Sequence, residues 1–168
     1  SVVSLKNLKV KDEIKVGAEP SAVALSPNGT RLYVANSSSN NLMVFDATKK
    51  KPRFITTVDL SAFGTAPRAI AITNDGDTDD TDETVFVALF YAQLRPGKTA
   101  QNETEDDQRE GRVVAISAAT NSVLGPTTTL QPISNTGFNA NGRLSPGPGQ
   151  VPNVPSTNPQ TFTTPTGS

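Results

Sequence analysis

The sequence predicts an all-β protein made of β-propeller blades, each with four antiparallel strands, and two observations support this prediction. The first is a unit of three short strands separated by turn residues, which occupies residues 19–48. The second is a repeat of that unit, because residues 66–72 match residues 19–25 without a gap. A period of about 40–50 residues with several short strands in each period is typical of a propeller blade.

The first copy gives a complete blade over residues 18–60. Its strands are expected at residues 21–26, 31–36, 41–46 and 53–60. The second of these strands is rich in the β-branched and aromatic residues that suit a pleated surface. Between the first two strands, Pro27 fixes φ, and Asn28-Gly29 tolerates the positive φ of a tight hairpin turn.

The second copy gives a blade over residues 66–130 that carries two insertions. Its strands are expected at residues 69–72, 85–94, 112–118 and near 122–130. Residues 85–88 match residues 32–35 only after six residues are added to the preceding turn, and a longer insertion is expected at 95–111. Insertions confined to turns are what a repeat scaffold tolerates.

The two ends of the sequence do not form complete blades. Residues 1–17 match the third and outer strands of a preceding half blade, and the charges interleaved in residues 9–17 discourage edge-to-edge pairing. Residues 131–168 are rich in Pro, Asn and Thr, so they bury too little apolar surface to offset the entropy of ordering them. This segment is expected to be either a linker or an extended segment held on another surface.

Two and a half blades are fewer than the roughly four to eight blades that a propeller needs. The sequence therefore predicts an incomplete ring, with the remaining blades supplied by another chain or by a part of the same polypeptide outside this sequence. Because the open faces of the blades would expose too much apolar surface, we expect that residues 1–168 do not exist as a free monomer.

Composition excludes several classes of function. The formal net charge is −1, from 15 basic and 16 acidic residues, so no basic face indicates a nucleic acid or a membrane surface as partner. No stretch approaches the roughly 18 apolar residues of a membrane span. The absence of His removes the commonest general base, and the absence of Cys removes thiolate chemistry and disulfides.

One group of residues has the character of a metal site, in the widened turn of the second copy. Carboxylates alternate at Asp75, Asp77 and Asp79, in the manner that lets a loop wrap its oxygens around Ca²⁺, and Asp82 and Glu83 would complete the shell. The loop is not an EF-hand, because Asp80 and Phe86 occupy its sixth and twelfth positions. Carboxylates so close together repel one another unless a cation neutralises them or water screens them. The loop is therefore either a Ca²⁺ site or a solvated acidic loop.

The run from Pro20 to Asn36, followed by Val44-Phe45-Asp46, resembles the YVTN-type β-propeller repeat. The signature tetrad reads Tyr33-Val34-Ala35-Asn36 in the first copy and has drifted in the second. That family is common in bacterial and archaeal surface and periplasmic proteins, so the resemblance implies an extracellular, cell-surface or periplasmic location. A WD40 propeller is disfavoured, because the chain lacks the Trp and His of the WD40 signature.

These observations favour a non-enzymatic scaffold or protein-interaction module of an exported or cell-surface protein, stabilised by Ca²⁺ if the acidic loop binds it. One alternative is an enzymatic propeller, such as a lactonase or a quinoprotein dehydrogenase, whose catalytic residues lie outside this chain. A second alternative is an accessory propeller that docks an electron-transfer partner. The fold itself does not decide among them, because propellers carry many unrelated activities.

Overall fold

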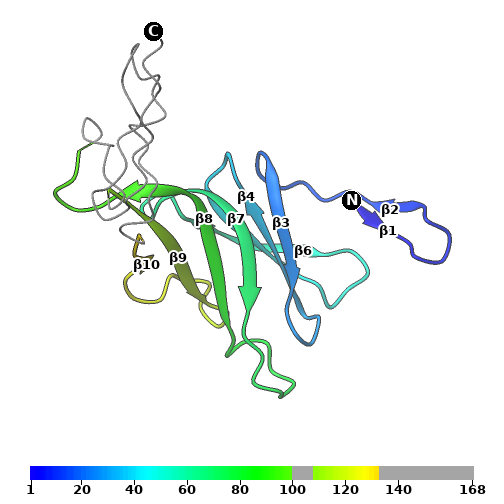
Figure 1. The fold of residues 1–168 in the computed structure, drawn as a ribbon. Helices are drawn as coiled ribbons and strands as arrows, with labels where there is room; N and C mark the ends of the chain where they lie inside the picture. The colour runs from blue at the N-terminus through cyan, green and yellow to red at the C-terminus, as the bar shows by residue number, and fades with distance from the viewer. Residues whose placement is uncertain (100–107, 133–168) are drawn as a thin grey trace, which may run out of the picture. The chain divides into compact units, whose positions relative to one another are not determined.

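The computed structural model describes residues 1–99 and 108–132. Within these ranges the chain forms β-strands in antiparallel sheets and no helix, so this part of the chain has no helix able to cross a membrane (Figure 1). One compact unit consists of Ser1–Tyr91 and Arg112–Thr128 and contains the packed core. Ala92–Gly111, which includes the last residues of one strand and the first of the next, belongs to a second unit.

Blade 1 is the four-stranded sheet that the first copy of the repeat predicts. Its strands pair in chain order and are β3 (Pro20–Leu25), β4 (Arg31–Asn36), β5 (Asn41–Asp46) and β6 (Arg53–Asp59). The bounds of β4 and β5 are those expected from the sequence. The Ser26–Arg31 turn closes the first hairpin, where Gly29 has the positive φ of 74° that its lack of a side chain allows.

Blade 2 is a second four-stranded sheet, in the order β10-β9-β8-β7. Its strands are β7 (Thr65–Ile72), β8 (Thr84–Leu94), β9 (Arg109–Ser117) and β10 (Thr128–Leu130). Two expectations need correction. Strand β9 begins at Arg109, inside the expected insertion, and the outer strand is only β10 together with a single bridge between Ile116 and Val123. Gly125-Pro126 interrupts the outer strand because proline cannot donate to a strand ladder.

The registers of the two blades are equivalent, which supports the alignment of the two copies. In blade 1, Val23 pairs with Val34, and a bulge lies between Pro20 and Ala22. In blade 2, Ile70 pairs with Val87, and a bulge lies between Pro67 and Ala69. Each pair and each bulge therefore falls at the same position of the repeat.

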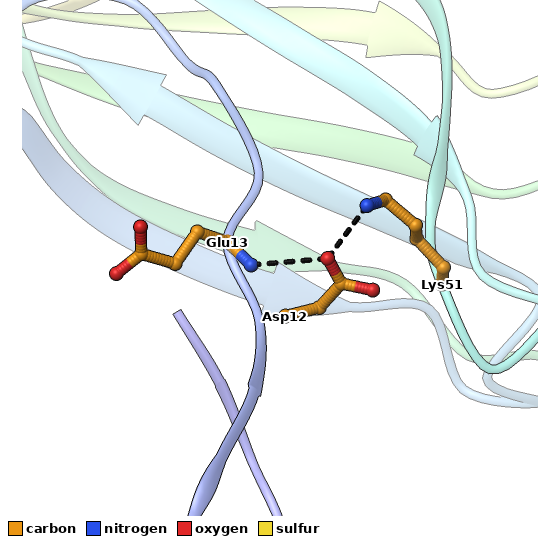
Figure 2. A network of polar contacts seen from close by, with 3 residues as sticks. All are labelled: Asp12, Glu13 and Lys51. Carbon is orange, nitrogen blue, oxygen red and sulfur yellow. Dashed lines mark hydrogen bonds and ion pairs between the residues drawn. The ribbon is translucent and has the colours of Figure 1, made fainter.

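In the region of the expected half blade, β1 (Val2–Val3) and β2 (Val10–Asp12) form a two-stranded antiparallel sheet. Figure 2 shows how β2 is tied to the β5–β6 turn of blade 1: Lys51 Nζ lies 2.6 Å from Asp12 Oδ1, which also accepts a hydrogen bond from the Glu13 N–H. The bond from Lys51 lowers the pKa of Asp12. Because the pair is exposed, we expect it to orient β2 more than to stabilise the fold.

The core lies between blade 1 and blade 2. Figure 1 shows β3 and β7 beside one another, and Ser21 Oγ on β3 donates a 2.6 Å hydrogen bond to the Pro67 carbonyl on β7. Buried side chains from both sheets form one cluster: Tyr33, Ala35, Leu42, Val44, Val58, Leu60, Val85, Val87, Leu89, Val114, Ile116 and Ala118. The inner strands of neighbouring blades thus contact one another but belong to different sheets, as the propeller prediction requires.

Candidate functional site

The acidic loop between β7 and β8 is organised by its own side chains. The side chains of Asn74, Asp75, Asp77 and Asp79 each accept a hydrogen bond from the backbone N–H two residues further on, at 2.7–3.1 Å. Such Asx turns are a common way for short polar side chains to hold an irregular backbone. They supply a physical reason for the alternation of acidic residues that does not involve a cation.

Three of the five predicted metal ligands lie together in this loop. Asp75, Asp77 and Asp82 each place one carboxylate oxygen within 4.8 Å of the others, and all three residues are exposed. The pKa of Asp82 is raised, first by burial and then by the charges of Asp75 and Asp77. Three hard oxygen ligands at this spacing fit the donor preference of Ca²⁺, so calcium binding here stays a prediction.

The other two predicted ligands make structural hydrogen bonds. Asp79 accepts from both the N–H and the hydroxyl of Thr81, which lowers its pKa. Glu83 is buried at the base of the loop, where it accepts from the Thr73 hydroxyl and from the Asp75 N–H. Both carboxylates therefore hold the loop in shape and lie outside the group formed by Asp75, Asp77 and Asp82.

The residue that sequence reasoning missed is Asp80, which is only 2% exposed. Its carboxylate points out of the acidic loop and accepts hydrogen bonds from the Ser26–Thr30 turn of blade 1. Burial raises the pKa of Asp80, but the hydrogen bonds from Thr30, Asn28 and Ser26 outweigh burial and hold the pKa well below the usual range of a carboxyl group. In the sequence, Asp80 stood out only because it replaces the glycine of an EF-hand.

A shallow pocket of about 460 Å³ lies beside the Asp80 carboxylate. It is lined by hydroxyl and carboxylate side chains together with Ile55 and Arg31. The Arg31 guanidinium donates to the Ala118 carbonyl at 2.7 Å and to Asn121 Oδ1 at 3.2 Å, so it links blade 1 to the β9–β10 connection. This arrangement can position polar groups, and the chain has no imidazole or thiol to supply a base or nucleophile here.

Apolar side chains are exposed on the outer faces of both blades. On β3 of blade 1, Val23 is 66% exposed and Leu25 is 55% exposed. On β8 of blade 2, Phe86 is 36% exposed and Phe90 is 59% exposed. The Arg68 guanidinium lies 5.0 Å from the centroid of the Phe90 ring, within the range of a cation–π contact. These two faces lie on opposite sides of the packed pair of blades.

This architecture defines the described chain as part of a β-propeller domain. Comparison with protein families agrees: the family model described as "Lactonase, 7-bladed beta-propeller" matches residues 3–78, somewhat less than half of the chain. No curated protein matches. Among solved structures, Kuenenia stuttgartiensis hydrazine synthase matches with 22% sequence identity and a TM-score of 0.43, over 77% of this chain and 42% of that one. This chain thus spans less than half of the length of that structure.

Proposed function

We propose that this chain is a segment of a larger propeller ring that serves as a non-enzymatic scaffold for protein interactions. One observation carries the proposal: the two blades bury opposite faces of the repeat against each other. Tyr33 of blade 1 lies in the core with no exposed surface, while Phe86, at the same position of blade 2, is 36% exposed. The difference arises because Tyr33 has blade 2 beside it.

The alternation along the strands makes this relation general. In blade 1, Tyr33 and Ala35 face the core, whereas in blade 2 the core residues are Val85 and Val87, which match Leu32 and Val34. Successive residues of a strand point to opposite faces. Blade 1 therefore presents one face of the repeat to blade 2, and blade 2 presents the opposite face of the repeat to blade 1.

Such head-to-tail packing leaves one apolar face of blade 2, and the β3 part of the opposite face of blade 1, uncovered among the described residues. Val23 on β3 is 66% exposed, whereas its equivalent in blade 2, Ile70, packs against the core. A propeller ring needs more blades than the described residues contain, so the remaining blades of the ring lie outside those residues. We infer that one such blade covers the Phe86 face and that another covers the Val23 face.

A scaffold role fits the chemistry of this segment better than a catalytic role does. The carboxylates of Asp79, Asp80 and Glu83 are engaged in hydrogen bonds that shape the fold. The chain has no His or Cys to form a conventional nucleophile–base pair. The resemblance of its repeat to those of surface and periplasmic propellers supports an exported location for the protein.

The proposal is tested by comparing residues 1–168 alone with the longest natural polypeptide that contains them. We expect the isolated segment to associate or aggregate through its open faces, and the longer polypeptide to be monodisperse with a cooperative thermal transition. Size-exclusion chromatography and circular dichroism distinguish the two outcomes. A cooperatively folded monomer of residues 1–168 would overturn the proposal that further blades cover these faces.

A second candidate function is lactone hydrolysis, and the match of residues 3–78 to a lactonase propeller model favours it. Opening a lactone ring releases a carboxylic acid, so a pH-stat assay of the longer polypeptide detects the reaction without a coupled enzyme. The scaffold proposal predicts no turnover above the uncatalysed rate. Turnover that disappears on removing blades other than these two would place the catalytic residues outside this chain and favour the lactonase.

We also propose that the Asp75, Asp77 and Asp82 group binds Ca²⁺ and stabilises the domain. A ligand that binds only the folded state adds about 2.7 kcal/mol to the free energy of unfolding at a concentration one hundred times its Kd. The melting temperature is measured in EGTA, in millimolar Ca²⁺ and in millimolar Mg²⁺ for the native protein and for Asp77→Asn. A rise specific to Ca²⁺ that Asp77→Asn reduces is expected. Equal melting temperatures in EGTA and Ca²⁺ would contradict calcium binding and favour a solvated acidic loop.

A further inference from the structure

The Ser26–Thr30 turn directs several hydrogen-bond donors to one point. The turn is closed by a 2.9 Å hydrogen bond from the Gly29 N–H to the Ser26 carbonyl, and Gly29 adopts a positive φ. This geometry frees the backbone N–H groups of Asn28 and Thr30 from the strand ladder. The hydroxyl groups of Ser26 and Thr30 lie beside them, so the turn forms a concave group of uncharged donors.

The Asp80 carboxylate occupies this group of donors. Its Oδ2 atom accepts from the Ser26 hydroxyl at 2.7 Å, from the Thr30 hydroxyl at 2.5 Å and from the Thr30 N–H at 3.1 Å. Its Oδ1 atom accepts from the Asn28 N–H at 2.9 Å and from the Asn28 side-chain amide at 3.3 Å. All five donors come from one turn in blade 1, and the acceptor comes from blade 2.

We propose that the Ser26–Thr30 turn is a carboxylate-binding site, and that Asp80 is its built-in ligand, which clasps the acidic loop of blade 2 onto blade 1. Concave groups of backbone N–H donors are known to bind anions, and hydrogen bonds to a charged acceptor are stronger than those between neutral groups. The carboxylate needs these donors, because Asp80 is only 2% exposed and a buried carboxylate without donors is costly. The site recognises a carboxylate in particular, since an amide in its place would turn an N–H group toward other donors.

The clasp also explains why the turn of blade 2 is longer than that of blade 1. The six added residues carry Asp80 back to the neighbouring blade, and Asn28 Nδ2 makes a further 3.1 Å bond to the Asp77 carbonyl of the same loop. The acidic loop is therefore held by two hydrogen bonds from the Asn28 side chain and by further hydrogen bonds from Ser26 and Thr30. The clasp requires no metal ion.

Hydrogen–deuterium exchange in the longest natural polypeptide, with EGTA present, tests the clasp. Asp80→Ala is expected to raise the exchange of amides in residues 73–84 and 26–31 by about tenfold or more, because the loop loses its attachment. Asp82→Asn is the matched control, since it removes a carboxylate from the same loop without touching the turn. Equal exchange in the two variants would overturn the proposal.

Chemical rescue tests whether the turn is itself a binding site. Asp80→Ala removes only the carboxylate, so formate has the shape and charge to fill the vacated position. We expect 100 mM formate to restore protection of residues 26–31 in Asp80→Ala, whereas chloride at equal ionic strength and neutral formamide do not. Rescue that chloride reproduces, or no rescue at all, would refute a carboxylate-binding site.

A milder variant keeps the proposal testable if Asp80→Ala does not fold. Thr30→Val preserves the shape of the side chain and removes only the hydroxyl that makes the shortest hydrogen bond to Asp80. It is expected to raise exchange in residues 73–84 less than Asp80→Asn does. In the double variant, the two effects should be clearly less than additive, because both remove the same contact. Additive effects, or no change of exchange in Thr30→Val, would count against the clasp.

Discussion

Tyr33 in blade 1 and Phe86 in blade 2 occupy the same position of the repeat, yet Tyr33 is fully buried and Phe86 is 36% exposed. The turns that precede these two strands differ in a related way. In blade 1 the turn is short and supplies donors, whereas in blade 2 it is extended and supplies the Asp80 acceptor. The surroundings of a residue in a repeat protein therefore depend on the neighbouring repeat as much as on its own.

The largest expected effect comes from truncating the two aromatic residues. Tyr33→Ala should lower the free energy of unfolding by about 3–5 kcal/mol, the range for buried aromatic side chains. If a further blade covers Phe86 in the longer polypeptide, Phe86→Ala should cost nearly as much there. Chemical denaturation of both variants measures the difference. A cost for Phe86→Ala below about 1 kcal/mol, typical of an exposed site, would show that no blade covers this face.

Giving blade 2 the short turn of blade 1 should have the next largest effect. Deleting residues 77–82 leaves a turn like the one that precedes β4, and shortening a loop by half favours folding by only about 0.6 kcal/mol. Losing the Asp80 contacts should cost more, about 1–3 kcal/mol, so the net free energy of unfolding should fall. Thermal melts in EGTA of the deletion variant and of Asp82→Asn provide the comparison. A deletion variant more stable than the native protein would show that the clasp contributes nothing.

The fold was largely predictable because its signals are local. Strands β4 and β5 follow from their β-branched and aromatic residues, and the Asn28-Gly29 turn between β3 and β4 follows from backbone chemistry. The equivalence of the two copies then predicts the two sheets. The outer strand of blade 2 was less predictable, because Gly125-Pro126 leaves little of it to pair.

The acidic loop was only partly predictable because its key contact is not local. Asp79 and Asp80 are neighbours in a run of acidic residues, and nothing in that run marks Asp80 as buried. Its partner Asn28 lies 52 residues away in the chain. The alternation of Asp75 and Asp77, which predicted calcium ligands, also fits the Asx turns that these residues form.

The clasp should respond to acid in a defined direction. The folded state holds the pKa of Asp80 below its value in the unfolded chain, so the ionised carboxylate stabilises the fold above pH of about 4, and this contribution is lost as the pH falls through the folded-state pKa. Asp80→Asn lacks this contribution at every pH. The difference in free energy of unfolding between the native protein and Asp80→Asn should therefore be constant above pH of about 5 and shrink below pH of about 4. Chemical denaturation curves of both proteins, recorded at a series of pH values across this range, measure the difference. A difference that grows on acidification would contradict a lowered pKa of Asp80 in the folded state.

The smallest expected effect concerns the one atom by which Tyr33 differs from the phenylalanine found at the same position of blade 2. The Tyr33 hydroxyl is buried and makes no hydrogen bond of normal geometry to the described residues, although the Arg31 side chain lies near enough to interact with it, and burial raises its pKa. A buried hydroxyl without a partner costs about 1–3 kcal/mol, and removing the oxygen leaves a void smaller than a methyl group. Tyr33→Phe should therefore leave the free energy of unfolding unchanged or raise it by up to about 1 kcal/mol, while Tyr33→Ala remains strongly destabilising. A clear loss of stability in Tyr33→Phe would mean that the hydroxyl is hydrogen-bonded, for example to a buried water between the blades, and that the two copies differ at this position for a structural reason.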